Sequence, residues 1–181
     1  MGFRLIIGNK ARDFKFSTPW GNEKTFYEAG GNQLVILIFL RYWGCPICRM
    51  EMTRIKNEFD LIIRKGAQLF VVLQSAPETV ASEINKDDFP FTIICDPEGR
   101  IFQLYGVEPG GLIRYLHPAG LVAAGVAIVK GFRHGKFEGK ETQLPAAFVI
   151  RDNKLIQYAH YGRNIADMPA LTAALWALLR P

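Results

Sequence analysis

Residues 34–40 form an unbroken run of seven apolar side chains rich in Val, Ile and Phe. Runs of this length and composition predict a strand that is buried on both faces of a sheet. Shorter apolar runs at 68–74 and 91–95 predict two further strands, and the Asp-Pro-Glu-Gly sequence at 96–99 predicts a turn that closes the third. The pattern therefore places a buried sheet in the first half of the chain.

The segments between these strands carry helical patterns. After the first strand, apolar residues recur at helical spacing among charged ones until Gly66, which predicts a helix over about 46–65. A second, more polar helix is expected at 77–85. Strands alternating with helices predict right-handed crossovers and parallel pairing, with the ligand site at the carboxyl ends of the strands.

Both ends of the chain predict hairpins. Residues 4–16 mix apolar and charged side chains, and the turn-forming residues at 18–22 predict short antiparallel strands that cover one edge of the core. Near the other end, 146–150 and 155–159 flank a tight Asp-Asn turn and predict a hairpin at the sheet edge. A final amphipathic helix is expected to begin at Asp167.

The first strand leads directly into a Cys-x-x-Cys pair, Cys45 and Cys48. Pro46 suits the first position of a helix, so Cys45 is predicted to be the N-cap. Free backbone N–H groups and the positive end of the helix dipole favour a thiolate there, which makes Cys45 the predicted nucleophile. Cys48 lies one turn further along the same helix face and is the predicted resolving thiol.

Such a pair can cycle between dithiol and disulfide. The alternatives are a pair of zinc ligands or two inert small residues. Zinc needs four ligands, and Cys95 lies in an apolar run without a neighbouring Cys or His, so redox chemistry is favoured over a metal site. Cys95 itself is interpreted as a buried apolar residue.

The composition of the chain limits the classes of protein to which it can belong. A chain of 181 residues with 49% hydrophobic and 22% charged residues is typical of one folded domain, taken as 1–181. With three cysteines and no secretory pattern at the N-terminus, we expect a cytoplasmic protein. We expect no transmembrane segment and, despite the net charge of +5, no nucleic-acid partner, because the basic residues follow no known nucleic-acid motif.

Four motifs, at 8–14, 42–49, 95–99 and 144–150, together resemble the alkyl hydroperoxide reductase and thiol-specific antioxidant (AhpC/TSA) family, and in particular peroxiredoxin-like proteins. The resemblance implies an α/β thioredoxin-like fold: a central mixed β-sheet flanked by helices, with an N-terminal hairpin and a helical insertion. It also implies a cis-proline loop facing the cysteines, which Pro145 matches. The resemblance implies no metal or organic cofactor. It does imply a thioredoxin- or glutathione-type reductant and pairing into a homodimer.

The sequence departs from the typical peroxiredoxin pattern around Cys45. Ile38 and Tyr42 stand where a proline and a Thr or Ser are usual, and Cys48 stands where a carboxylate is common. The arginine that supports the thiolate has no match in its usual place. Three arginines are candidates to replace it, since a cation lowers the pKa of a nearby thiol: Arg41, Arg49 and Arg163.

Two further features have both a functional and a packing interpretation. Tyr42 and Trp43 either shape a substrate groove or pack beside the strand end. Residues 107–143 form an insertion that could be a lid, a dimer surface or a patch for a lipid-like or anionic substrate. An extra helix pair that covers the sheet is favoured for this insertion, with a helical face made of Ile113, Leu116, Leu121, Val126, Ile128 and Val129.

Three functions remain open on the sequence. The first is reduction of hydroperoxides through a Cys45 sulfenic acid that condenses with Cys48. The second is reduction or exchange of protein disulfides by the same pair. The third is a redox-sensing module that binds a partner through the insertion.

Overall fold

The computed structural model describes residues 3–169, apart from the side chains of residues 22 and 23. Within this range the strands are β1 (Lys15–Thr18), β2 (Gly21–Thr25), β3 (Leu34–Phe39), β4 (Ala67–Leu73), β5 (Thr92–Cys95), β6 (Ala146–Ile150) and β7 (Ile156–Tyr161). The helices are α1 (Phe26–Gly30), α2 (Pro46–Asn57), α3 (Phe59–Ile63), α4 (Pro77–Glu83), α5 (Arg100–Leu104), α6 (Gly111–Tyr115) and α7 (Pro118–Val129). The predicted strands at 34–40, 68–74, 91–95, 146–150 and 155–159 and the predicted helix at 77–85 are thus confirmed to within a few residues.

One seven-stranded sheet runs through the molecule in the order β2-β1-β5-β4-β3-β6-β7. The central pairs β3–β4 and β4–β5 are parallel, as the alternation of strands and helices predicted. The outer pairs are antiparallel, including β3–β6 and β1–β5. The sheet is therefore mixed: its central strands are parallel, whereas β1 and β6 run antiparallel to the central strands that they pair with.

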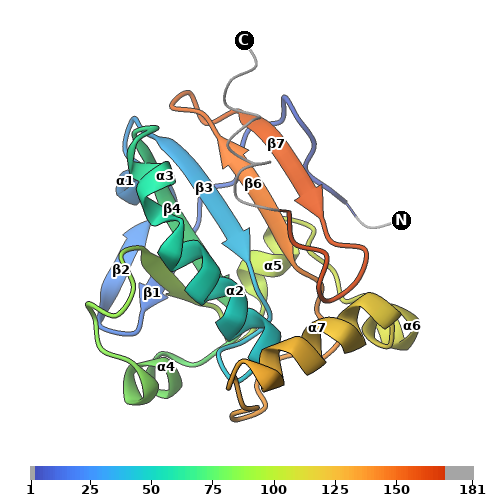
Figure 1. The fold of residues 1–181 in the computed structure, drawn as a ribbon. Helices are drawn as coiled ribbons and strands as arrows, with labels where there is room; N and C mark the ends of the chain where they lie inside the picture. The colour runs from blue at the N-terminus through green and yellow to red at the C-terminus, as the bar shows by residue number, and fades with distance from the viewer. Residues whose placement is uncertain (1–2, 170–181) are drawn as a thin grey trace.

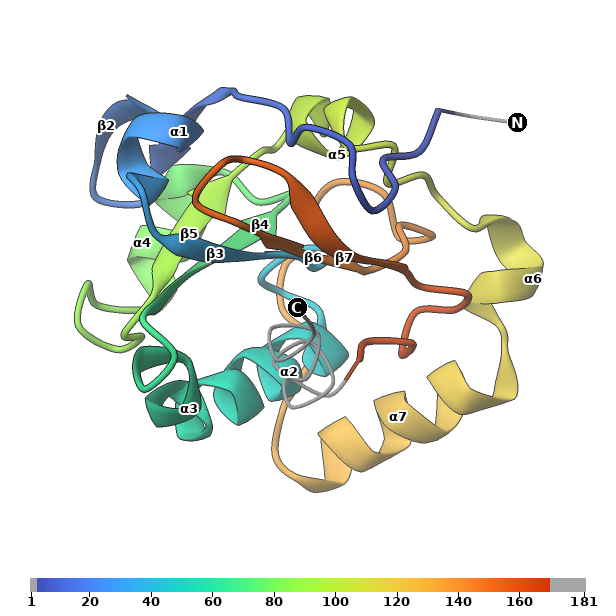
Figure 2. The same ribbon diagram turned by 90° about the horizontal axis from the view of Figure 1, so that it is seen from above.

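Helices cover both faces of this sheet (Figures 1 and 2). On one face α2, α3, α4 and α7 enclose a core that includes Ile36, Met52 and Ile55. On the other face α1 and α5 enclose a second, aromatic-rich core around Phe39 and Phe148. β3 supplies alternate residues to both cores, which confirms it as the central strand buried on both sides.

Both hairpins form where the sequence placed them. β1 pairs with β2 and also with β5, so the N-terminal hairpin covers one edge of the sheet. β6 and β7 pair antiparallel through the 151–154 turn and form the opposite edge. Lys154 adopts a positive φ of 67° in that turn and is the one non-glycine residue in the described range to do so. The predicted final helix falls largely on residues outside the described range.

The helices differ from the expectation in two places. The 46–65 helix is broken at Glu58, which leaves helical geometry (ψ 5°) and separates α2 from α3. Apolar spacing identifies the buried side of a helix but does not reveal a one-residue break. The short helix α1 was not predicted, although Thr25 and Glu28 form a capping box at its start.

The implied cis-proline is wrong for this structure, because the described residues contain no cis peptide bond and Pro145 is trans. The trans form of an X–Pro bond is preferred by only about 0.5–1 kcal/mol, so the surrounding loop rather than the proline itself decides the isomer. Pro145 still precedes β6 at the site of the cysteines, and its carbonyl accepts a hydrogen bond from the Gly162 amide (2.8 Å).

The 107–143 insertion leaves the sheet and returns to it at nearly the same place. Its two ends are joined by a β-bridge between Pro109 and Gln143 and by a hydrogen bond from the Gly110 amide to the Thr142 carbonyl (2.8 Å). Between these ends, α7 packs against α2 on the outside of the molecule (Figure 2). No helix of the described residues is both long enough and apolar enough to cross a membrane.

The prediction that six large apolar residues of the insertion cover the sheet is wrong. All six are exposed, and α7 instead buries Gly120 and Ala127 against the protein. Small residues let the backbone of α7 approach closely, and this seating turns the larger side chains outward.

Candidate active site

Cys45 occupies the N-cap of α2, as the sequence predicted. Its backbone is extended (φ −76°, ψ 120°), and its Sγ accepts a hydrogen bond from the Cys48 amide (3.3 Å). Pro46 stands in the first turn, where its missing N–H leaves no donor unsatisfied. Cys45 and Cys48 are both thiols and both buried, with 0% and 4% of their surface exposed.

Of the three candidate arginines, Arg41 is the one that reaches Cys45. Its Nη2 atom donates to Cys45 Sγ over 2.9 Å, and its side chain is buried. The Glu141 carbonyl accepts from Nη1 at 2.7 Å, and the Glu141 carboxylate lies 3.4 Å from the same atom. Tyr115 of α6 also donates to that carboxylate (3.4 Å). A residue of the insertion therefore fixes the guanidinium that faces Cys45.

The other two candidate arginines lie elsewhere. Arg163 is 88% exposed and forms an ion pair with Asp167 (2.9 Å), so the structure does not bring it to Cys45. Arg49 stacks over the indole ring of Trp43, 5.2 Å from its centroid. Sequence alone could not show which of the three arginines reaches Cys45. The answer depends on the segment before β6, where Glu141 holds the Arg41 side chain in place.

The two thiols have opposite electrostatic environments. Burial raises the pKa of the Cys45 thiol, but the hydrogen bond from the Cys48 thiol, the charge of Arg41 and the Cys48 amide outweigh it and lower the pKa to about 6. Burial and the neighbouring Cys45 sulfur raise the pKa of Cys48 well above its usual value. At neutral pH this arrangement favours one thiolate, on Cys45, beside one thiol, on Cys48.

Tyr42 and Trp43 are buried beside the pair and pack rather than form an open groove. The Tyr42 hydroxyl lies 3.0 Å from His134 Nε2, and the Trp43 amide donates to Ser75 Oγ (2.8 Å). Tyr42 thus connects the loop before Cys45 to the insertion, in addition to the link made by Arg41 and Glu141.

Gly135 of the insertion contacts Gly44, which directly precedes Cys45. The Gly135 amide donates to the Gly44 carbonyl (2.8 Å). A Cβ atom on Gly44 would lie 2.2 Å from the Lys136 carbonyl oxygen, so only glycine permits this approach. Residues 130–143, hereafter the covering segment, therefore lie directly against the residue that precedes Cys45.

A small cavity of about 80 Å³ adjoins Cys48. Arg41 and Cys48 line one side of it, and Ala123 of α7, Pro145 and Ile165 contribute to the other walls. Its volume suits a few water-sized molecules or a small functional group rather than a folded polypeptide segment.

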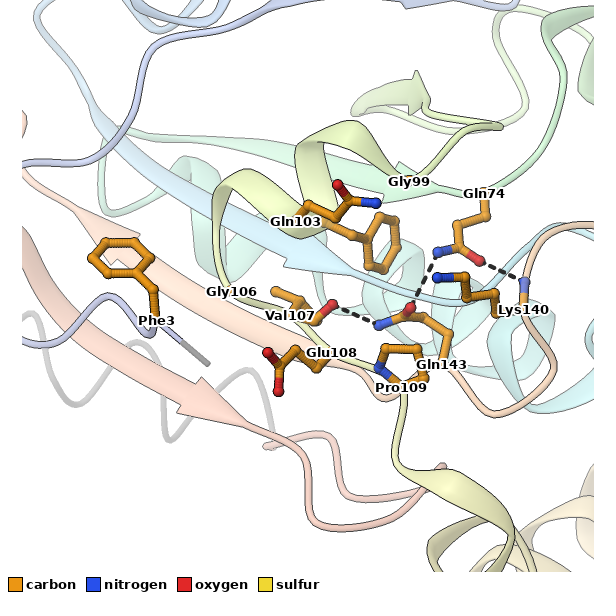
Figure 3. A pocket seen from close by; sticks show the side chains of 11 residues that line it. Phe3, Gln74, Gly99, Gln103, Gly106, Val107, Glu108, Pro109, Lys140 and Gln143 are labelled. Carbon is orange, nitrogen blue, oxygen red and sulfur yellow. Dashed lines mark hydrogen bonds between the residues drawn. The ribbon is translucent and has the colours of Figure 1, made fainter. Parts of the chain in front are cut away.

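A second cavity, of about 160 Å³, contains neither active-site cysteine (Figure 3). It lies where Gln74, after β4, meets the base of the insertion. Gln74 donates to Gln143 (3.2 Å) and accepts from the Lys140 amide (2.8 Å), while Gln143 donates to the Val107 carbonyl (2.9 Å). These buried amides hold the two ends of the insertion together, so the cavity is part of its anchor.

Cys95 stands apart from the pair. It ends β5, where it is paired with Leu73 and Ser17. Burial, together with the charges of Glu138 and Glu78, raises the pKa of its thiol to about 12, which keeps it protonated and unreactive at neutral pH. Among residues 3–169, no cluster of three or more His, Cys, Asp or Glu side chains is arranged to hold a metal ion.

Sequence reasoning missed three contributors to the site, namely Glu141, His134 and Gly135. All three belong to the covering segment, about 90 to 100 residues after the cysteines. Their position shortly before the Pro145 loop was the available signal, because the resemblance placed that loop opposite the cysteines.

Comparisons with solved structures agree on the fold. A peroxiredoxin-like protein from Aquifex aeolicus superimposes with a TM-score of 0.68 at 18% identity, covering 98% of this chain and 89% of its own. A yeast mitochondrial 1-Cys peroxiredoxin gives 0.67 at 16% identity, covering 97% and 75%. A Chlorobium tepidum structure described as a thiol:disulfide interchange protein, DsbE, gives 0.63 at 22% identity, covering 97% and 99%.

These likenesses establish an α/β thioredoxin-like fold with a mixed sheet. They include both peroxiredoxins and a disulfide interchange protein, so they leave the reaction open. Among curated proteins, none matches this chain. The sequence model of the AhpC/TSA family, however, matches residues 7–159, and this protein therefore belongs to the AhpC/TSA family of thiol oxidoreductases.

Proposed function

We propose that this protein reduces hydroperoxides through a dithiol–disulfide cycle of Cys45 and Cys48. The observation that carries the proposal is the burial of both cysteines, with the covering segment against Gly44 and a cavity of only about 80 Å³ beside Cys48. A protein disulfide must bring two bulky backbone segments to the attacking sulfur, whereas a hydroperoxide presents a small O–O group. The enclosed site therefore favours the smaller substrate.

The thiolate of Cys45 attacks the terminal oxygen of the hydroperoxide. The S–O bond forms as the O–O bond breaks, so Cys45 becomes a sulfenic acid and the leaving alkoxide takes a proton from solvent. The Arg41 guanidinium, 2.9 Å from Cys45 Sγ, stabilises the thiolate beforehand and stands beside the oxygens on which negative charge develops.

Cys48 then closes the cycle. Its sulfur attacks the sulfenic sulfur, the S–S bond forms as the S–O bond breaks, and the departing hydroxide leaves as water with the Cys48 proton. The structure favours these roles because Cys48 keeps its proton while Cys45 is ionised. An external thioredoxin- or glutathione-type thiol would return two electrons to the disulfide, which fits a reducing compartment such as the cytoplasm.

Disulfide exchange with proteins is the second candidate. The observation in its favour is the Cys-x-x-Cys at the N-terminus of α2, in which Cys45 has the lowered pKa that exchange requires. This reaction would need the covering segment to move off Gly44 so that a protein substrate can reach Cys45.

Stopped-flow oxidation of the reduced protein tests the proposal. Hydrogen peroxide and an organic hydroperoxide are mixed with the wild type, Cys45→Ser, Cys48→Ser and the control Cys95→Ser. Trp43, buried next to the pair, is expected to contribute a fluorescence change. We expect a fast phase in the wild type and in Cys95→Ser, its loss in Cys45→Ser, and a trappable sulfenic acid in Cys48→Ser. Oxidation no faster than that of a free thiol, combined with rapid reduction of insulin, would establish disulfide exchange instead.

A further inference from the structure

The outer side of α6 and α7 carries eight large apolar side chains that the protein leaves uncovered. They form what we call the outer face: Leu112, Ile113, Leu116, Leu121, Val122, Val126, Ile128 and Val129. Ile113 and Val129 are each 89% exposed. Monomeric proteins rarely expose so many large apolar residues on neighbouring turns, and such patches mark interaction sites.

The inner side of α7 explains why these residues do not turn inward. Ala127 is fully buried, and a Cβ atom on Gly120 would lie 2.7 Å from Ile165 Cγ1. The side of α7 that carries small residues therefore already packs against the rest of the protein, and a larger side chain would not fit there. The outer face is a stable feature of the fold.

Charge identifies the partner that suits this face. Residues 109–137 contain no acidic residue, and four basic residues lie among or directly after the apolar ones, namely Arg114, Lys130, Arg133 and Lys136. All four are exposed. Two acidic residues flank this stretch: Glu108, which is exposed, and Glu138, which accepts a hydrogen bond from the Thr79 hydroxyl (2.7 Å). The region is thus both apolar and cationic.

We propose that the outer face docks on the surface of an anionic lipid bilayer. α7 would lie in the plane of the interface with its apolar residues among the acyl chains and the basic residues at the headgroups. A helix of 12 residues is about 18 Å long and is too short to span a bilayer. A second copy of this chain suits the face less well, because residues 109–137 of that copy would offer no acidic residue to pair with the four basic ones.

Vesicle flotation tests this docking without reference to catalysis. The reduced protein is mixed with vesicles of phosphatidylcholine alone or with a third of phosphatidylserine, at low and at high salt. The test variant is Val129→Glu with Lys130→Glu. The matched control is Ile63→Glu with Arg64→Glu, which changes the same kind of exposed apolar–basic pair in and just after α3. All four positions are exposed, so both variants are expected to fold, and circular dichroism checks this.

We expect the wild type and the control to float with anionic vesicles at low salt and to be released as salt screens the charges. The test variant should lose about tenfold or more of its partitioning, because one basic residue is removed and two acidic ones are added. Absence of wild-type binding, or an equal loss in the control, would overturn the proposal. It would also be overturned if ultracentrifugation showed a dimer that the test variant dissociates while vesicles bind neither protein. The vesicles contain no hydroperoxide, so a failure of the proposed peroxidase activity would not affect this result.

Discussion

α2 and α7 are the two longest helices in the described part of the chain, and they begin with the same local features but pack differently. Each has twelve residues, a proline in its first turn and an N-cap side chain that accepts a backbone hydrogen bond, Cys45 in α2 and His117 in α7. α2 buries Ile47, Cys48, Met52 and Ile55, whereas α7 buries only Gly120 and Ala127. The local signals that start a helix therefore do not decide which of its residues face the core.

The difference lies in what surrounds each N-terminus. Around α2, Arg41 and the Cys48 thiol add to the free amides of the first turn, so the N-cap atom becomes an ionised sulfur. Around α7, the start of the helix is exposed and its neighbours are apolar. The N-terminus of α2 thus stabilises a thiolate, whereas the N-terminus of α7 lies within the stretch that carries the exposed outer face.

The largest expected effect is on the free energy of unfolding, and it should differ between the same substitution made in α2 and in α7. Ile55→Ala in α2 removes a fully buried side chain and should lower the free energy of unfolding by about 2–5 kcal/mol. Ile128→Ala in α7 removes a side chain that is 60% exposed and should change it by less than about 0.5 kcal/mol. Urea unfolding measures both. Similar losses would mean that the outer face is covered in solution.

Removing the positive charge near Cys45 should have the second-largest effect, on the rate at which Cys45 reacts. Arg41→Met is expected to raise the pKa of the Cys45 thiol, because an opposite charge shifts such a pKa by about one to three units. From a starting value of about 6, this shift should slow alkylation at pH 7 by about two- to ninetyfold. Arg49→Met is the matched control, since Arg49 contacts the Trp43 ring. Equal rates in the wild type and Arg41→Met would show that the amides and Cys48 alone stabilise the thiolate.

Two glycines of α7 should respond in opposite directions. Gly120→Ala places a methyl group 2.7 Å from Ile165 and should destabilise the protein by about 1–3 kcal/mol. Gly125→Ala meets no atom within 4 Å and should stabilise it by about 0.5–1 kcal/mol, because alanine favours a helix. Thermal unfolding compares the two variants, and the same sign for both would contradict the seating of α7 described above.

The pH dependence should give the smallest effect. A group with a lowered pKa is ionised above that pKa, so alkylation of Cys45 should rise about tenfold from pH 5 to pH 7, with a midpoint near 6, and then level off. Cys48, with a raised pKa, should contribute nothing over this range. Iodoacetamide kinetics by mass spectrometry follow each cysteine separately. A midpoint near the ordinary thiol value would show that Cys45 is not activated.

Much of the fold follows from short-range patterns. The apolar run before the cysteines identified β3, turn-forming residues placed both hairpins, and Pro46 placed Cys45 at the start of α2. Each of these depends on residues within a few positions of one another, where backbone preferences and periodicity act. The break at Glu58 and the trans form of Pro145 were not predictable in this way, because neighbouring elements decide them.

The sequence by itself determined that a pair of thiols stands at a helix N-terminus directly after a central strand, and it predicted that this pair is reactive. Only the tertiary structure selected Arg41 as the partner of Cys45, since its guanidinium is fixed by Glu141, 100 residues away. Tertiary packing also turned the large apolar residues of α7 outward, because the small residues opposite them allow a closer approach to the protein. A hydrophobic pattern specifies that a side chain is apolar, but the surface it contacts depends on how distant segments fit together.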